Sequence, residues 1–264
     1  MRDKLIGLLV AVLGICLAAG SVGPAEAKFR DALNFEDNQF VNISKLIVEQ
    51  DANISSLEGF HRIRAISGSD NGRPDGTFLD YQLTSGVMSF FEVGVNFPVR
   101  FYDNGTQGNG DISIFQRFKF QEATEGLPAS SGGIELIFPT GDENSNPPTG
   151  TDNFNARLFG SLEHSLDENW IWLANGGVTF FGGDQYENRL EYNGALRYQP
   201  SSQLKLMVEA LGQSGGFRDQ SEFYLAPGAN LKTESDFSIM VTVPVGLTDD
   251  SPDFKPSLQF AHEF

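Results

Sequence analysis

The chain has 264 residues, and its 18 basic and 35 acidic side chains give a formal net charge of −17 at pH 7. This acidity argues against a nucleic-acid partner, which would require a basic face. The single cysteine, Cys16, rules out an intramolecular disulfide framework.

Residues 1–27 have the pattern of a secretory signal peptide. A charged start, Met1–Lys4, precedes the apolar stretch Leu5–Ala19 and the small-residue cleavage motif Ala25-Glu26-Ala27. Cys16 lies in this stretch, so the mature chain would hold no cysteine. Cys16 as a lipoprotein attachment site is the alternative, but bulky Ile15 stands where a small residue is expected.

Residues 28–57 form the next expected segment and do not fit a strand pattern. Phe35–Gln39 is polar, whereas Leu46–Val48 is a short apolar island. The segment could be a periplasmic extension, a plug in the lumen of a barrel, or one further strand. We favour an extension that packs partly into the inner mouth.

Residues 58–264 alternate between apolar and polar side chains with a period of two, which is typical of strands with two different faces. Residues 204–210, Leu-Lys-Leu-Met-Val-Glu-Ala, show the pattern. About twelve such runs occur, near 58–66, 77–85, 89–98, 111–120, 132–139, 153–164, 169–180, 187–198, 203–212, 221–230, 235–244 and 255–264.

The lengths of these runs favour a membrane barrel. Most approach the roughly 9–11 residues of a tilted membrane-spanning strand, whereas globular strands average closer to 5–6. Past the signal, the sequence contains no apolar run near the roughly 20 residues of a transmembrane helix. We therefore expect an all-β fold, an antiparallel transmembrane β-barrel of about twelve strands over residues 58–264.

The connections give a second indication, because outer-membrane barrels have long outer loops and short periplasmic turns. The expected outer loops are Ser67–Gly76, Phe101–Gly110, Thr140–Asp152, Phe181–Tyr186, Gln213–Gln220 and Gly246–Phe254. The expected inner turns are Gly86–Met88, Gln121–Ser131, Ser165–Glu168, Gln199–Ser202 and Leu231–Glu234. Each outer loop is longer than every inner turn except Gln121–Ser131.

The last run resembles the C-terminal sorting signal of bacterial outer-membrane proteins. Its alternating residues are Leu258, Phe260, His262 and Phe264. His262 departs mildly, since an aromatic residue such as Tyr is more common there. The resemblance implies delivery to the outer membrane by the barrel-assembly machinery.

Four segments resemble one bacterial outer-membrane family, named for the MetA pathway of phenol degradation. They are GGIELIFPTGD at Gly132–Asp142, FEVGVNFP at Phe91–Pro98, GDISI at Gly110–Ile114, and the ending Ser257–Phe264. The resemblance spans roughly 89–264. It implies a transporter-like barrel in the outer membrane that passes small molecules, among them aromatic or apolar compounds.

The polar face would line the interior of such a barrel. By alternation it carries Arg117, Lys119, Glu135, Arg157, Glu163, Arg189, Glu191, Arg197, Lys205 and Glu209. Because small barrels fill their interior with side chains, these residues could form a purely structural charge network. In a wider barrel they would bias permeation instead.

Thr140, Gly141 and Asp142 begin the longest expected outer loop. The loop could fold inward as a constriction, or bind a divalent cation together with Asp152. Its acidic spacing does not match a calcium-binding loop. We favour a turn that needs the conformational freedom of Gly141.

Enzymatic activity is not expected. Gly212–Gly216, with the sequence GQSGG, matches the letters of a nucleophile elbow, but helical spacing does not follow it. The histidines His61, His164 and His262 do not have metal-ligand spacing. We therefore expect neither a catalytic set nor a metal site nor a cofactor.

The most consistent hypothesis is an outer-membrane barrel for passive passage of small molecules, in contact with lipid and lipopolysaccharide. The alternative is a structural or adhesive barrel that conducts nothing and uses its outer loops for binding. A soluble periplasmic β-protein would not explain the alternating loop lengths.

Overall fold

The computed structural model describes residues 59–70, 73–88, 90–124, 126–183, 187–216, 221–233, 237–249, 251 and 256–263. The predicted signal peptide, the segment 28–57 and Phe264 lie outside these residues and stay predictions. Among the described residues, the structure does not contain a helix long and apolar enough to cross a membrane.

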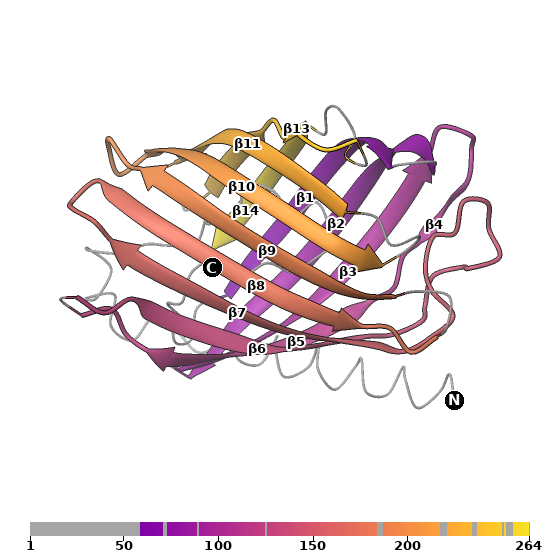
Figure 1. Ribbon diagram of the computed structural model, residues 1–264, viewed down its shortest axis with the longest axis horizontal. Helices are drawn as coiled ribbons and strands as arrows, with labels where there is room; N and C mark the ends of the chain where they lie inside the picture. Colours follow the sequence, from indigo (N-terminus) through magenta and orange to yellow (C-terminus); the bar gives the residue numbers. More distant parts are fainter. Residues whose placement is uncertain are drawn as a thin grey trace.

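Strands account for most of the described chain (Figure 1). In order they are β1 Gly59–Asp70, β2 Arg73–Met88, β3 Phe91–Tyr102, β4 Gln107–Asn109, β5 Ser113–Gln121, β6 Ala129–Ile137, β7 Asn155–Ser165, β8 Trp170–Phe180, β9 Glu187–Tyr198, β10 Leu204–Gly216, β11 Ser221–Lys232, β12 Phe237–Thr242, β13 Val245–Gly246 and β14 Ser257–Glu263.

The strand pairings form a closed antiparallel ring. From β1 to β12 each long strand pairs with the next along the chain, with β3 pairing to β5. β14 pairs with both β12 and β1 and so joins the two ends of the series. The short β4 pairs with β3, and β13 continues the β12 edge along β11.

Within the described residues, the ring therefore holds twelve strands, which cross the barrel obliquely (Figure 1). Each overlaps one of the twelve runs predicted from the alternation. The predicted antiparallel all-β fold is confirmed. We call the end that carries the long connection between β6 and β7, residues 138–154, the outer end.

One expected outer loop is wrong. Residues Ser67–Gly76 are mostly paired backbone, since β1 extends to Asp70 and β2 begins at Arg73. The composition of this stretch, rich in Gly, Ser, Asn and Pro, predicts a turn. Backbone pairing needs no apolar side chains, however, so the hairpin continues beyond the amphipathic part. Likewise, the expected loop Gln213–Gln220 and turn Gly86–Met88 begin with strand residues of β10 and β2.

Burial across the barrel wall is the reverse of that in a water-soluble protein. Leu158 and Val208 expose 52% and 50% of their surface on the outside. Arg197 and Glu135, on the inside, expose only 0% and 2%. Water would penalise both features, but a lipid bilayer favours the apolar exterior and leaves the interior to polar groups.

Glycines in the strands make room for two inward aromatic rings. A Cβ on Gly94 would lie 2.2 Å from the ring of its cross-strand partner Phe115. A Cβ on Gly133 would lie 2.7 Å from the ring of its partner Phe159. The two rings are buried and pack against each other. Small residues opposite large ones therefore fill this part of the interior.

Exterior residues near mid-strand should be sensitive to charge. We expect Val208→Arg to lower the free energy of unfolding by about 2–4 kcal/mol, because it places a charge in the hydrocarbon layer. The matched control is Thr77→Arg, at an exposed position near the outer end of β2, which should cost about 1 kcal/mol or less. Denaturant unfolding in lipid vesicles would measure both, and equal effects would contradict a lipid-facing β10.

Candidate functional site

The structure places all ten charged residues predicted for the interior on the inward face. Eight are buried, and Lys119 and Arg189 are partly buried. The inward positions were predictable because alternation along a strand assigns each side chain to one face. Whether any of them meets a solute stays a prediction.

Arg157 on β7 is the centre of one cluster. Its Nη1 lies 3.5 Å from Glu135 Oε2, and its Nε lies 3.2 Å from Glu191 Oε2. Arg189 Nε lies 2.7 Å from the other oxygen of Glu191. The Arg157 guanidinium also lies 5.1 Å from the centre of the Phe159 ring. Its charge is thus balanced on two sides by carboxylates.

The backbone explains how Arg157 reaches Glu191, which is two strands away. Glu135 is its direct cross-strand partner on β6, but β8 separates Arg157 from β9. Gly177 occupies the intervening position on β8, opposite Glu191. A Cβ there would lie 3.0 Å from both Nε and Nη2 of Arg157. Gly177 therefore leaves the space through which the arginine crosses β8.

Two further ion pairs continue this arrangement toward β2. Arg117 Nη2 lies 2.7 Å from Glu92 Oε2, and Arg100 Nη1 lies 3.4 Å from Asp80 Oδ1. We define the charged sector as the inward side chains of Asp80, Glu92, Arg100, Arg117, Glu135, Arg157, Arg189 and Glu191. It holds four positive and four negative groups, so its charges balance internally.

Sequence reasoning missed three members of the charged sector. Asp80 lies in the weakly patterned run 77–85, and Arg100 follows the predicted end of the run 89–98. Glu92 alternates correctly with its neighbours and could have been found from the pattern. Their pairing across strands depends on register, which the sequence did not provide.

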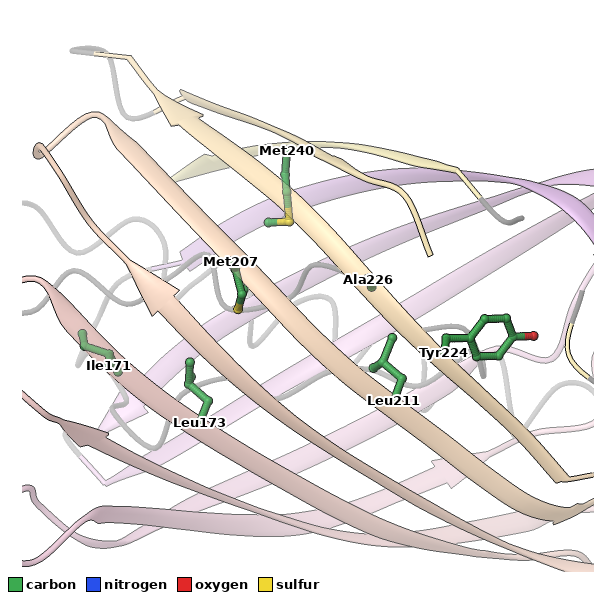
Figure 2. Packing of buried hydrophobic residues seen from close by; sticks show 7 residues of the cluster. All are labelled: Ile171, Leu173, Met207, Leu211, Tyr224, Ala226 and Met240. Atoms are coloured by element: carbon green, nitrogen blue, oxygen red, sulfur yellow. The ribbon is translucent and has the colours of Figure 1, made fainter. Parts of the chain in front are cut away.

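A second sector of the inward face is apolar (Figure 2). We define the apolar sector as Ile171 and Leu173 of β8, Met207 and Leu211 of β10, Tyr224 and Ala226 of β11, and Met240 of β12, which pack together as one buried cluster. Leu211 and Tyr224 are direct cross-strand partners. Sequence analysis did not identify this sector, because each strand contributes only one or two of its residues.

The motif residues Thr140 and Gly141 bind a neighbouring connection rather than a ligand. The Ile112 amide donates to Thr140 Oγ1 over 2.8 Å, and the Gly141 amide donates to Asp111 Oδ1 over 3.0 Å. Asp111 Oδ2 accepts from the amide and the hydroxyl of Thr151, at 2.8 and 2.7 Å. Asp111 therefore holds both ends of the loop 138–154.

The same loop contacts the connection between β3 and β4, beside β4 at the outer end (Figure 1). The Tyr102 hydroxyl donates to Pro148 O over 3.1 Å, and Thr106 Oγ1 donates to Asn146 O over 2.6 Å. Gly141 lies so close to Gly150 that a Cβ on it would be 2.5 Å from the Gly150 Cα. The favoured turn interpretation is consistent with these contacts, although the motif also joins two loops.

Acidic side chains in this loop interact with each other. The pKa of Glu143 is raised by desolvation, by a hydrogen bond with Asp152, and by the negative charges of Asp152 and Asp142. Asp142 itself accepts from the Asn144 amide. Within the described residues, we find no group of three or more His, Cys, Asp or Glu side chains that could hold a metal ion.

The residues of the predicted sorting signal lie on β14, the strand that closes the ring. Leu258 and Phe260 expose 38% and 37% of their surface on the outside, and His262 is also exposed. Ser257 and Gln259 point inward and are buried. The alternation is as predicted, whereas recognition by the assembly machinery stays a prediction.

The GQSGG string does not have the setting of a nucleophile elbow. Gly212–Gly216 ends strand β10, where Ser214 pairs with Leu190 and Ser221 on its two sides. His164 lies on β7 next to Trp172, with ring centres 6.3 Å apart. In the described part of the chain, this serine is therefore a strand residue.

The sequence profile of the family described as "Putative MetA-pathway of phenol degradation" matches residues 36–264. The chain belongs to this family. No curated protein matches the sequence. The family match extends the resemblance seen in residues 89–264 to the N-terminal side.

Solved structures of outer-membrane barrels share the fold of this family member. An outer-membrane channel from Pseudomonas putida F1 is 14% identical, with a TM-score of 0.65 over 85% of this chain and 100% of that chain. The KdgM porin is 9% identical, with a TM-score of 0.56 over 78% and 99%. The NanC porin is 9% identical, with a TM-score of 0.54 over 76% and 97%.

Together with the apolar exterior, these similarities place the family member in the bacterial outer membrane, as a channel-like barrel.

Replacing Arg157 should destabilise the barrel strongly. In Arg157→Met, Glu135 and Glu191 stay buried without their shared partner, so we expect unfolding to become easier by about 3–5 kcal/mol. Urea unfolding in detergent would measure the change. As a control, Lys119→Met removes a pair whose acid, Glu122, is 76% exposed, and should cost about 1 kcal/mol or less. A similar loss in both variants would refute the importance of the Arg157 cluster.

Removing the Asp111 carboxylate should release the outer loop without opening the barrel. We expect Asp111→Ala to lower the free energy of local opening around Gly141 and Thr151 by about 2–3 kcal/mol, because charged acceptors make the stronger hydrogen bonds. Amide hydrogen exchange would report this. Asp103→Ala, at an exposed turn position, is the control and should leave the exchange unchanged.

Proposed function

We propose that the protein is a passive, energy-independent outer-membrane channel for small molecules. The observation that carries the proposal is the two-part inward face of a closed barrel. The charged sector pairs its own charges, and the apolar sector lies on strands β8 and β10–β12. A barrel that only spans the membrane does not require an apolar patch on its inside.

The same division supports aromatic or apolar solutes. Self-neutralised charges leave little net attraction for ions, whereas an apolar surface lowers the free energy of an apolar solute relative to water. The family description, with its reference to phenol degradation, agrees with this class. The KdgM porin, by contrast, has been seen with oligogalacturonate, a polyanion that the paired charged sector would not favour.

A non-conducting structural or adhesive barrel is the second candidate. It is favoured by the near-complete burial of inward side chains such as Arg197 and Asn230, which expose 0% and 1%. Such shielding agrees with an interior that is filled rather than open. Conductance separates the two candidates.

We expect single-channel currents from the purified full chain in planar bilayers with potassium chloride. A variant lacking residues 28–57 should conduct more if this segment restricts the lumen. Heat-modifiable gel migration would first show that both proteins form folded barrels. Silence of both folded proteins would overturn the channel proposal and support the structural candidate.

A further inference from the structure

The apolar sector is bordered by side-chain amides that lack hydrogen-bond partners. Among the described residues, the buried oxygens of Asn175, Asn193, Gln213, Asn230 and Gln259 accept no hydrogen bond, and Asn230 Nδ2 donates none. Asn230 and Gln259 expose only 1% and 3% of their surface. A buried polar group without a partner is costly, so such groups mark places where a further molecule can bind.

The strand register places these amides around the apolar side chains. At one end, Asn175 pairs with Asn193, which pairs with Leu211. At the other end, Asn230 and Gln259 lie on the two sides of Met240. Cross-strand neighbours are about 5 Å apart at Cβ. The amides at each end are therefore within reach of a small molecule that lies on the apolar sector.

Two carboxylates fix the orientation of two of these amides. Asn193 Nδ2 donates to Glu209 Oε1, and Gln213 Nε2 donates to Glu222 Oε2 over 2.9 Å. An ionised carboxylate can only accept, so the amide nitrogen must face it. Asn193 Oδ1 and Gln213 Oε1 are therefore the free ends. The Tyr224 hydroxyl donates to the same Glu222 oxygen over 2.8 Å.

The chemistry of the unfilled groups selects a class of ligand. Five oxygens against one nitrogen require hydrogen-bond donors from the ligand, and a carboxylate has none to offer. Tyr224, Met207 and Met240 favour a flat aromatic ring through ring stacking and sulfur contacts. The nearby cations Arg197 and Lys205 already have partners of their own.

We propose that the apolar sector and its bordering amides form a binding site for a small, neutral aromatic molecule that carries hydroxyl groups. The ring lies on the apolar side chains, and the hydroxyls donate to amide oxygens such as those of Asn193, Gln213 and Gln259. The proposal deepens the proposed function and rests on it for the role of the site in passage, although binding itself can be measured without transport.

The test uses the full chain in lipid nanodiscs, with calorimetric titration corrected for empty nanodiscs. The probes are resorcinol, 1,3-dimethoxybenzene, which keeps the ring but lacks donors, and benzoate. We expect resorcinol to bind at least about fivefold more tightly than either of the others, as the loss of one hydrogen bond predicts. Equal binding of the three probes, or no binding of resorcinol to the intact chain, would overturn the site.

Two variants locate the site. Asn230→Leu and Gln213→Met remove an amide at similar volume, and each should weaken resorcinol binding by about three- to tenfold. Gln82→Leu is the control, because Gln82 is a buried inward amide on β2 that already donates to Thr84. Binding that is unchanged in the first two folded variants, or weakened equally in the control, would contradict the proposal.

Conductance keeps the two proposals apart. A barrel that conducts but does not bind resorcinol retains the channel function and loses this site. A folded barrel that binds resorcinol with the expected variant pattern but never conducts retains the site and loses the channel function. Occupation of the apolar sector by the chain's own residues 28–57 would show as absent binding in the intact protein, and so would also overturn the site.

Discussion

The structure depends on one constraint: in a bilayer, every backbone amide and carbonyl must find its partner within the protein. The pairing of β14 with both β1 and β12, and of β10 with β11, meets this constraint by leaving no open edge in the ring. Closure then assigns one face of every strand to lipid and the other to the interior. The period-two pattern of the sequence follows directly from this division.

Closure also creates the problem of charged side chains in a narrow interior. The charged sector meets it by pairing, and glycines determine which pairs can form. Gly177 gives Arg157 its path across β8 to Glu191, and Gly133 leaves room for the Phe159 ring next to the same guanidinium. A residue with a side chain at Gly177 would separate Arg157 from one of its two carboxylates. The interior charge network is therefore encoded as much by absent side chains as by charged ones.

Alternation made most of the barrel predictable, since the twelve runs and the inward position of residues such as Arg197 follow from local pattern alone. Three things did not follow. Strand ends such as Ser67–Gly76 depend on backbone pairing, which does not require amphipathic side chains. The link between Asp111 and the loop 138–154 joins residues that are distant in sequence. The apolar sector requires the register of β8, β10, β11 and β12, because single residues such as Met240 look unremarkable within their own strand.

The two inward sectors also differ in what they leave unsatisfied. In the charged sector, carboxylates and guanidinium groups neutralise one another, so a passing ion gains little by displacing a partner. Around the apolar sector, carboxylates hold the nitrogen ends of Asn193 and Gln213 and leave the oxygen ends without donors. The acids there thus orient acceptors instead of binding solutes themselves. An interior built in this way discriminates by hydrogen-bond donation and shape rather than by charge, in a protein whose overall charge is −17.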